Sequence, residues 1–356
     1  MRRDTGTDDP RVKVRAGKSK RPRTKIRPDW STSPLGHVIA IDRGRYRVRM
    51  DDATTLNAVR AKELKRGSVI MGDRVRVTGD VSGHVDTLAR IVAVEERTSI
   101  LRRSLEDAPD QRGEKAIVAN ADTMCIVVAL ADPPPRTGMI DRCLVAAYEA
   151  GMTPILCLTK SDLGVPSELF ATYDPFGFRI IVTQALEGGK ATPTKGIEAL
   201  KGELAGHFSV LVGHSGVGKS TLINALVPDA HRSVGHVNEV TGRGRHTSTS
   251  SEAFELPEGG WIMDTPGVRS FGLGHVDEED VLGVFPEVAE ATSWCLPLCS
   301  HAEGEPSCAI DAWARGEVPF EAVCHEDSAR RNAMALSVRR LLNAVNTAKQ
   351  ASRDAR

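Results

Sequence analysis

Short apolar stretches that alternate with polar residues fill the chain from Gly36 to about Leu105. Turn sequences such as Asp42-Arg43-Gly44 and Ser82-Gly83 separate these stretches. Alternation with a period of two is typical of strands that bury one face. The clearest strand patterns cover residues 37–41, 46–50, 75–78 and 89–94. About five strands in roughly 70 residues predict a small closed barrel of the OB type, rather than a sandwich of about seven or more strands.

A different pattern begins near residue 116. Continuous apolar runs with the length of buried strands lie at 124–130, 154–158 and 208–212, and a shorter one lies at 179–183. Segments with apolar residues at helical spacing, 138–150 and 196–204, come between them. Strands that alternate with helices build a parallel sheet with helices on its faces. The middle of the chain is therefore predicted to be an α/β domain.

The two ends of the chain have patterns of their own. Nine Lys and Arg residues lie between positions 11 and 27, among almost no large apolar residues, so this segment is predicted to be disordered. Beyond about residue 275, short helical pieces precede one longer helix over about 326–350. The apolar side predicted for that helix carries Ala335, Leu336, Val338, Leu341, Leu342 and Val345. The chain thus divides into a basic disordered tail (1–33), an OB-type barrel (34–106), an α/β domain (107–275) and a C-terminal α-helical domain (276–356).

The composition narrows the class of protein. With 356 residues, 40% of them apolar and 26% charged, the chain is an ordinary globular protein of about two or three domains. No apolar run approaches the ~18 residues of a membrane span and no signal-peptide stretch is found, so we expect a cytoplasmic protein without membrane contact. Seven cysteines, with three of them between residues 295 and 308, favour thiols and a metal site over a disulfide framework.

One segment matches the pattern of a phosphate-binding loop, G-x-x-x-x-G-K-[ST], between an apolar strand pattern and a helical one. Its candidate nucleotide-binding residues are Gly213, His214, Ser215, Gly216, Val217, Gly218, Lys219, Ser220 and Thr221. In such a loop the glycines let backbone N–H groups converge on an anion at a helix N-terminus. The Lys219 ammonium serves the β- and γ-phosphates, and the Ser220 hydroxyl is a ligand for Mg²⁺. The alternative, an accidental glycine-rich turn, leaves the flanking strand and helix unexplained.

A second candidate element, Asp264-Thr265-Pro266-Gly267, follows the apolar stretch 261–263. A carboxylate at a strand end can hold Mg²⁺ through water, and the Gly267 N–H can meet a γ-phosphate oxygen. Alone, this tetrapeptide would be interpreted as an ordinary turn. Together with the phosphate loop, it favours a phosphate-sensing function.

A third element, Thr159-Lys160-Ser161-Asp162, ends the strand pattern 154–158 and resembles the N/T-K-x-D base-reading element of GTPases. The Asp162 carboxylate can accept hydrogen bonds from guanine N1–H and the 2-amino group, whereas adenine has no 2-amino donor. The methylene stem of Lys160 can lie over the base plane. Lysine and aspartate in a turn are commonplace and usually solvated, so the tetrapeptide is informative mainly through its position.

The order of these elements is unusual. Ordinary GTPases carry the phosphate loop first and the base reader last, whereas here the reader at 159–162 precedes the phosphate loop at 213–220 and the element at 264–267. The α/β domain is therefore predicted to be a circularly permuted P-loop GTPase domain, an arrangement that compact domains tolerate. The loop after Gly267 then leads directly into the C-terminal domain.

The basic segment 241–249 occupies the place of the first switch. Thr247 or Thr249 can complete the Mg²⁺ shell, and Thr247 is the preferred candidate because it adjoins the turn. Val268 stands where many GTPases have a glutamine that orients water, so intrinsic hydrolysis should be slow. His246 is the candidate for the water-orienting group, moved into place by a partner; the alternative is a solvated loop histidine. The catalytic candidates are His246, Thr247, Asp264 and Gly267.

Cys295, Cys299, His301 and Cys308 place four metal-binding side chains within 14 residues. Three thiolates and one imidazole suit tetrahedral zinc, and because all four positions are closed the metal would be structural. Free thiols or a redox pair are the alternative. Cys125 and Cys157 lie in apolar strand patterns and are predicted to be buried packing residues.

The permuted order, the Gly-Arg-Gly-Arg-His-Thr segment 242–247, the barrel in front and the Cys₃His cluster behind together resemble the ribosome small subunit-dependent GTPase A family, over about residues 36–325. The resemblance implies GTP hydrolysis stimulated by the small (30S) ribosomal subunit, a role in its late maturation, and contacts of barrel and zinc domain with ribosomal RNA. It also implies that Lys160 and Asp162 read guanine, that residues 213–220 bind phosphates and Mg²⁺, and that the Cys₃His set holds one Zn²⁺.

Three features depart from the pattern of that family. Thr159 replaces the commoner asparagine, which would lose an amide that braces the phosphate loop. The metal-ligand spacings of three and six residues differ by one from the commoner four and five. After the strand pattern 179–183 stands Gln184-Ala185 instead of the Ser-Ala that contacts guanine O6, so that contact is unassigned.

The leading interpretation is a GTP-driven assembly factor that acts as a monomer on the small ribosomal subunit and its 16S rRNA, with Mg²⁺ as the partner of GTP. Lys62, Lys65 and Arg66 of the barrel, the basic tail and the arginines of the last helix would meet RNA phosphates, so binding would depend on salt. Two alternatives stay open: a nucleotide-gated RNA-binding scaffold with negligible turnover, and an ATP-dependent P-loop kinase or nuclease regulator. GTP turnover in the presence of subunits tests the scaffold alternative. The base preference of the Asp162→Asn variant tests the ATP-dependent one.

Overall fold

The computed structural model describes residues 29–84, 86–104, 114–184, 186–187, 190–191, 195–227, 230, 251–264, 276–305, 308–317 and 328–354. Contacts divide the chain into one unit of residues 1–32 and a second of residues 33–356. The fold and the sites lie in the second unit. Among the described residues, no helix combines the length and the apolar character that crossing a lipid bilayer requires.

Five strands near the N-terminus close into a barrel, as predicted. They are β1 (Leu35–Asp42), β2 (Arg45–Met50), β3 (Thr55–Arg60), β4 (Arg74–Gly79) and β5 (Ala89–Val94). They pair in the order β1-β2-β3-β5-β4, and β4 returns to pair with β1. Strand β2 shows the period of two directly, because it buries Tyr46, Val48 and Met50 and exposes Arg45 and Arg47.

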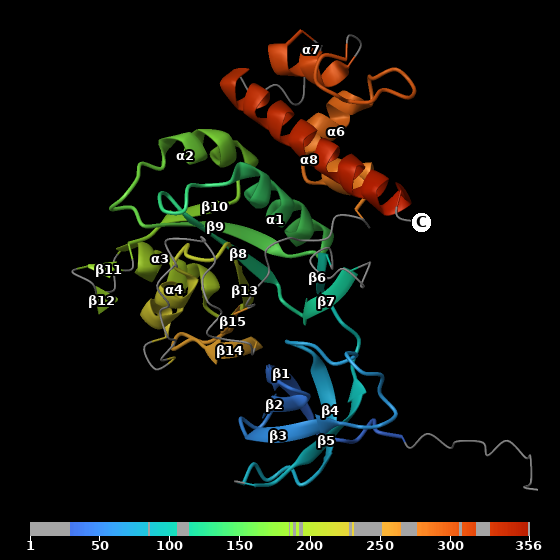
Figure 1. Ribbon diagram of the computed structural model, residues 1–356, viewed down its shortest axis with the longest axis vertical. Coiled ribbons are helices and arrows are strands. Elements are labelled where there is room, and N and C mark those ends of the chain that lie inside the picture. The colour runs from blue at the N-terminus through green and yellow to red at the C-terminus, as the bar shows by residue number, and fades with distance from the viewer. Residues whose placement is uncertain are drawn as a thin grey trace, which may run out of the picture. The chain divides into compact units, whose positions relative to one another are not determined.

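The α/β domain holds a parallel sheet between two layers of helices, again as predicted (Figure 1). Its parallel strands run in the order β10 (Arg179–Val182), β9 (Thr153–Thr159), β8 (Thr123–Ala129), β13 (Phe208–Val212) and β15 (Trp261–Asp264). The helices are α1 (Thr137–Glu149), α2 (Ser167–Tyr173), α3 (Lys195–Leu204) and α4 (Lys219–Leu226), with the short η1 (Asp174–Phe176) after α2. All of these elements except α2 and η1 match a predicted segment to within a few residues.

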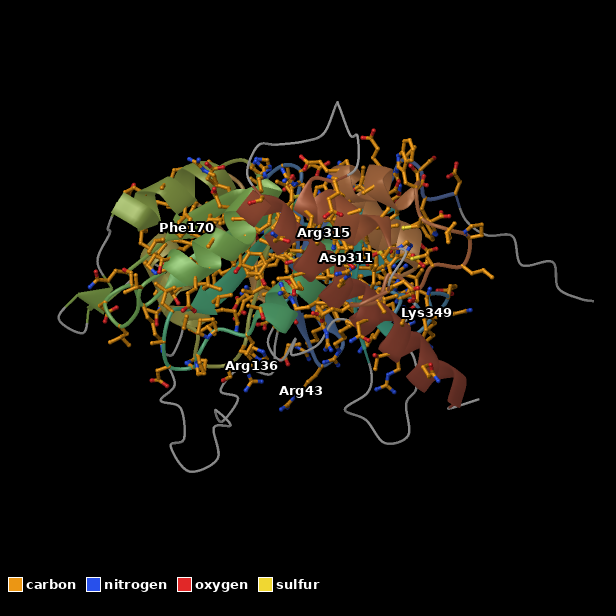
Figure 2. The ribbon with its side chains drawn as sticks, turned by 90° about the horizontal axis from the view of Figure 1, so that it is seen from above. Arg43, Arg136, Phe170, Asp311, Arg315 and Lys349 are labelled. Carbon is orange, nitrogen blue, oxygen red and sulfur yellow. The ribbon has the colours of Figure 1, made fainter. Side chains whose placement is uncertain are left out.

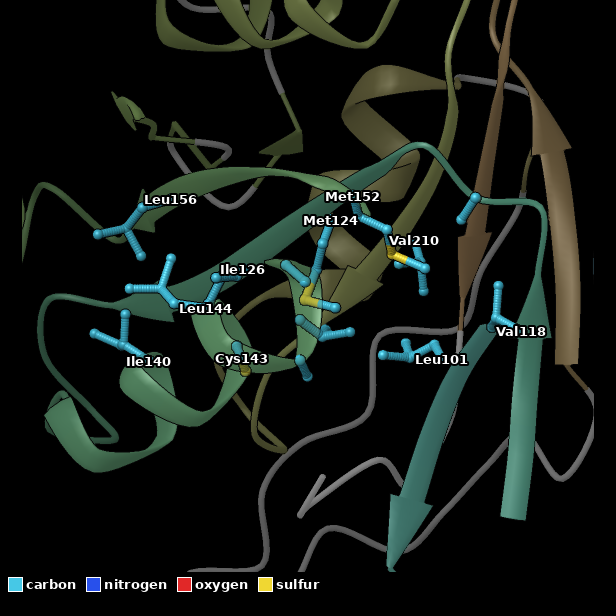
Figure 3. Packing of buried hydrophobic residues seen from close by; sticks show 14 of the residues in the cluster. Leu101, Val118, Met124, Ile126, Ile140, Cys143, Leu144, Met152, Leu156 and Val210 are labelled. Atoms are coloured by element: carbon cyan, nitrogen blue, oxygen red, sulfur yellow. The ribbon is translucent and has the colours of Figure 1, made fainter. Parts of the chain in front are cut away.

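Strand β8 explains how the helices attach to both faces of the sheet. Met124, Ile126 and Val128 belong to one core cluster, together with Ile140 and Leu144 of α1 (Figure 3). The residues that alternate with them along the strand, Cys125, Val127 and Ala129, belong to a second cluster with residues of α3 and α4. Since successive strand residues point to opposite faces, a strand that is apolar throughout is buried on both sides. The prediction that Cys125 and Cys157 are buried packing residues is confirmed.

Several elements were not predicted. The hairpin of β6 (Ile100–Ser104) and β7 (Glu114–Ala119) crosses the expected boundary at residues 106 and 107, and its Leu101 and Val118 pack into the core cluster that α1 covers. The two-residue strands β11 (Leu186–Glu187) and β12 (Lys190–Ala191) form a small separate pair. Strand β14 (Ser251–Glu255) pairs antiparallel with β15 on one side and with barrel strand β1 on the other. One hydrogen-bonded sheet therefore runs from the α/β domain into the barrel.

The C-terminal region is helical, as expected. It consists of α5 (Glu278–Gly283), α6 (Pro286–Thr292), α7 (Ala309–Arg315) and the long α8 (Ser328–Asp354). Phe285 and Trp313 are fully buried in its core, against Val338 and other apolar residues of α8. The expectation that Leu336 shares this face is wrong, because its side chain is 49% exposed. The buried residues 334, 335, 338, 341, 342 and 345 follow the helical repeat, and position 336 lies off that stripe.

Two of the α8 arginines that are expected to meet RNA make hydrogen bonds within the protein. Arg340 donates from Nε to the buried carboxylate of Asp141 on α1, at 2.8 Å. Arg339 donates to Asp311 of α7 at 2.5 Å, and its Nε donates to the His301 carbonyl at 3.3 Å. Both guanidinium groups join α8 to its neighbours, Arg339 from a buried position and Arg340 with its side chain 39% exposed.

Candidate nucleotide site and metal centre

The phosphate-loop sequence lies between strand β13 and helix α4, the context that its pattern requires. Glycine is needed at two of its positions. A Cβ on Gly213 would stand 2.4 Å from the Val127 carbonyl oxygen, and Gly218 has a φ of 97°, which side chains of L residues rarely adopt. Gly218 caps α4, and Lys219 is the first residue of that helix. Backbone N–H groups therefore gather at a helix N-terminus, where anions bind.

The Lys219 ammonium is already inside the loop. Its Nζ donates to the carbonyls of Gly213 at 2.6 Å and His214 at 2.8 Å. Burial disfavours the charged form and lowers the pKa of Lys219 to about 8, while the nearby Asp264 carboxylate acts in the opposite direction. The amine can exchange these carbonyls for phosphate oxygens, whose charge would favour the ammonium form.

Thr159 braces the phosphate loop, contrary to the expectation that the replacement of asparagine loses this support. Its hydroxyl donates to the Val217 carbonyl at 2.6 Å, and its side chain is buried. A hydroxyl and an amide are both donors, so the shorter side chain makes the contact wherever the loop comes close enough to the strand. The base-reading segment and the phosphate loop are thus directly bonded.

The remaining residues of the base-reading segment surround this contact. Lys160 has a left-handed backbone (φ of 57°), and its Nζ donates to the carbonyl of Asp132, which follows strand β8. The Ser161 N–H donates to the Thr183 carbonyl, at 3.4 Å, beyond the end of β10. Asp162 is exposed to solvent, with its carboxylate accessible to a ligand. The sequence analysis did not identify Asp132 as a partner of Lys160. Its position just after the predicted strand 124–130 was the only signal in the sequence that could have suggested it.

Asp264 is the last residue of β15 and is 6% exposed. It lies opposite Leu211 of β13 in the register of the parallel pair. Thr159, Gly213 and Asp264 therefore all stand where parallel neighbouring strands end, at the carboxyl edge where open α/β sheets bind ligands. The structure brings together three elements that are widely separated in sequence. Thr265, Pro266, Gly267, Val268, His246 and Thr247 lie outside the described residues.

The four predicted metal ligands also come together. The ligand atoms of Cys295, Cys299, His301 and Cys308 all lie within 4.8 Å of one another. His301 Nδ1 is 3.6 Å from the Cys295 sulfur and 3.7 Å from the Cys308 sulfur. Metal–sulfur and metal–nitrogen bonds of ~2.3 and ~2.0 Å in a tetrahedron place N and S about 3.5 Å apart, so these residues fit a tetrahedral ion.

The surroundings of the metal-binding cluster orient its ligands. The second imidazole nitrogen of His301, Nε2, lies 3.0 Å from Glu278 Oε1, so the carboxylate can hold the ring with Nδ1 toward the three thiols. The Cys295 sulfur accepts from the Ala309 N–H at 3.2 Å. Cys308 caps helix α7 and links the metal cluster to the domain core.

Comparisons with known proteins agree with this arrangement. The family model described as RsgA GTPase matches residues 94–274. A small ribosomal subunit biogenesis GTPase RsgA from Pseudomonas syringae is 40% identical over 251 residues, which are 68% of each chain. One from Pseudomonas putida is 37% identical over 293 residues, which are 79% of this chain and 80% of that protein.

Solved structures show the same fold. The crystal structure of YjeQ from Thermotoga maritima has a TM-score of 0.58 at 25% identity, and the match covers 86% of this chain and 98% of that one. YloQ, described as a circularly permuted GTPase, also has a TM-score of 0.58, at 22% identity, over 88% of this chain and 95% of that one. The base reader, phosphate loop and Asp264 lie along the chain in that permuted order. By sequence match, fold and phosphate loop together, the chain belongs to the RsgA GTPase family.

Proposed function

We propose that this GTPase acts in the maturation of the small ribosomal subunit and that binding to the subunit accelerates its hydrolysis of GTP. The observation that carries the proposal is the direct bond from Thr159 to the Val217 carbonyl, because it joins a base-reading segment to a phosphate loop in the permuted order. The names of the relatives, which describe small ribosomal subunit biogenesis GTPases, supply the partner.

Guanine is read by Asp162 in this proposal. The exposed carboxylate stands three residues after the buried Thr159 and accepts from N1–H and the 2-amino group. Lys160, whose Nζ is held by the Asp132 carbonyl, presents its methylene stem to the base. Residues 213–221 bind the phosphates, and Ser161 completes the reading segment.

Magnesium and the hydrolytic water are assigned to a second group of residues in this proposal. Mg²⁺, when bound with GTP, neutralises charge on the β- and γ-phosphates. Ser220 and Thr247 would supply its ligands, and Asp264 at the end of β15 would hold it through water. The Gly267 N–H senses the γ-phosphate. His246 orients the attacking water once the subunit has placed its loop, which accounts for stimulation by a partner.

The Cys₃His cluster holds one structural zinc ion in this proposal. Three sulfurs and one nitrogen are donors that zinc prefers, and all four positions come from the protein, so none is left for substrate. Metal analysis of the purified protein should find one zinc per chain. Retention of zinc by a Cys299→Ser variant at full stoichiometry would contradict the assignment of this ligand.

The exposed basic residues of the barrel are the candidate contacts for 16S rRNA. Lys62, Lys65 and Arg66 are exposed, and Arg43 in the β1–β2 turn points away from the protein (Figure 2). Arg47 and Arg49 are paired with Glu252 and Glu255 of β14. RNA phosphates attract such side chains in a salt-dependent way. We further propose that the protein works as a monomer in the cytoplasm.

Exchange of the base tests the nucleotide assignment. Asp162→Asn should weaken GTP binding and admit xanthosine triphosphate, because the 2-oxo group of xanthine accepts from the new amide. Asp174→Asn, at another exposed aspartate, is the matched control and should bind GTP normally. Unchanged GTP affinity in Asp162→Asn would remove this residue from the base site. Pelleting with purified small subunits, but not with large ones, tests the partner separately.

A further inference from the structure

The metal-binding loop presents three large apolar side chains to solvent. Trp294 is 61% exposed, Leu296 is 62% exposed and Leu298 is fully exposed. They alternate with or flank the metal-binding residues Cys295 and Cys299, whose side chains point the other way, toward His301. We call Trp294, Leu296 and Leu298 the apolar tip.

The apolar tip is held outward by its own framework. The cysteines on either side of Leu296 and Leu298 are tied into the metal-binding cluster, and the Cys295 sulfur also accepts from the Ala309 N–H of α7. The cluster therefore fixes the backbone on both sides of Leu296 and Leu298, whose side chains lie in solvent. Clustered exposed apolar residues on a rigid frame are typical of protein interaction sites. Most other large apolar residues of this domain lie in its core.

The residues around the apolar tip are mostly acidic, which favours a basic partner. Residues 277–317 contain ten Asp and Glu and a single Arg, Arg315. Three of these carboxylates are paired, Glu278 with His301, Asp311 with Arg339 of α8, and Glu317 with Arg315, which leaves an acidic excess. Arg315 is itself paired with Glu317 at 2.9 Å. Exposed Glu290 and Glu303 stand four and five residues from the two ends of the tip. A nucleic acid or an anionic membrane would be repelled here, whereas a basic protein surface would be attracted.

We propose that the apolar tip docks onto a basic protein, which inserts an apolar side chain between Trp294 and Leu298 and pairs its lysines and arginines with the surrounding carboxylates. Placing that partner on the small ribosomal subunit rests on the proposed function, and there the partner of the apolar tip itself is a ribosomal protein. The RNA contacts that the family resemblance implies for this domain then involve other parts of its surface. The barrel carries the exposed Arg and Lys side chains and meets RNA. The two ends of the protein thus recognise the two chemical components of one particle.

Photo-cross-linking tests the identity of the partner. The cross-linker p-benzoylphenylalanine replaces Leu298 in the full-length, metal-loaded chain. The matched control carries it at Leu336, which is also an exposed leucine of the helical domain but lies on α8. Each protein is irradiated with intact small ribosomal subunits, with the proteins extracted from them, and with their protein-free RNA. Pelleting with intact subunits before irradiation reports on the proposed function independently.

The expected adduct at position 298 is a basic protein, formed with intact subunits and with extracted proteins, resistant to ribonuclease and lost at high salt. Position 336 should give no such adduct. Cross-linking of position 298 to RNA or to a second copy of the chain would overturn the proposal, as would the lack of a protein adduct in both protein-containing mixtures. An adduct with extracted proteins but no pelleting would support the docking surface while contradicting the proposed function.

A substitution gives a second, quantitative test. Leu298→Ser removes the most exposed side chain of the apolar tip and should weaken binding of the cross-linked protein by about tenfold or more, as at a central interface residue. Leu336→Ser should leave that affinity unchanged. Because both side chains are exposed, thermal unfolding of both variants should match that of the original protein, which separates docking from folding. Equal affinities for the two variants would contradict the proposal.

Discussion

The hydroxyl of Thr159 holds the phosphate loop at the position where an amide was expected. The sequence alone predicted that residues 159–162 stand at the end of a strand. It did not predict which acceptor the Thr159 hydroxyl would bond. Whether a short side chain reaches the Val217 carbonyl depends on the separation of strand and loop, at 2.6 Å between the two oxygens here. Partner atoms of this kind require coordinates, because residue types fix the donors and not the distances.

Removing that hydroxyl should weaken nucleotide binding. Thr159→Val keeps the shape but leaves the buried Val217 carbonyl without its donor, which costs about 1–2 kcal/mol, or roughly 5–30-fold in the Kd for GTP. Thr159→Ser should restore most of the affinity. Titration with a fluorescent GTP analogue measures it, with Thr153→Val at the exposed start of the same strand as control. Equal Kd values for Thr159→Val and the control would contradict the brace.

The buried Lys219 should make GTP binding depend on pH. Its pKa is lowered to about 8 from an ordinary value of 10.5, so above pH ~8 the free protein loses the ammonium charge. Bound phosphates favour the charged form, so binding takes up a proton in this range and affinity falls as the pH rises. Calorimetry at pH 9 in buffers of different ionisation enthalpy should detect the uptake. At pH 6.5 Lys219 is already protonated in the free protein, so it should contribute no proton uptake. An affinity for GTP that does not change from pH 7 to 9.5 would contradict the role of Lys219 in phosphate binding.

At the scale of elements, strong periodicity made most of the structure predictable. Strands β8, β9 and β13 are mostly apolar because helices cover both faces, and the barrel strand β2 alternates because only one face is buried. Strand β14 was missed because only its central residue, Ala253, is buried. Its place is set by pairing with β15 and β1, which are non-local contacts that no local pattern records.

Helix α8 is joined to the α/β domain by an ion pair that periodicity did not predict. Asp141 of α1 is 2% exposed, and it accepts from Arg340 of α8 at 2.8 Å and from the Tyr173 hydroxyl at 2.8 Å. Burial raises the pKa of Asp141, and the guanidinium counteracts this shift. A buried charge needs such partners, so the pair links the helical region to the nucleotide-binding domain.

Arg340→Met should therefore destabilise the protein by about 3–5 kcal/mol at neutral pH, because it leaves a buried carboxylate without its cation. The pKa of Asp141 would rise further, so the folded state would bind a proton that the unfolded state has released. The free energy of unfolding of the variant should then increase as the pH falls from 7 to 5.

Urea unfolding at the two pH values measures this effect. Arg315→Met, which removes an exposed arginine of α7, is the control and should unfold like the original protein. A variant Arg340→Met that loses stability equally at pH 7 and pH 5 would contradict the role of the buried carboxylate.

At the scale of the whole molecule, the sequence predicted the order of the parts and the site motifs, but not their connection. Barrel strand β1 pairs with β14 at Ala40 and Ile41, and ion pairs from Arg47 to Glu252 and from Arg49 to Glu255 reinforce the junction. Strand β14 also pairs with β15, which ends at Asp264 in the nucleotide site. Barrel and candidate nucleotide site thus share one sheet, and under the proposed function this sheet is the physical route from the bound particle to the hydrolysis of GTP.

The most direct measurement is GTP turnover by the purified protein with and without small ribosomal subunits, with large subunits and ATP as parallel controls. We predict slow turnover of the protein alone and an increase of an order of magnitude or more that requires both GTP and the small subunit, as expected when a partner completes a GTPase site. The same rate with and without small subunits, or equal stimulation by large subunits, would contradict the central claim.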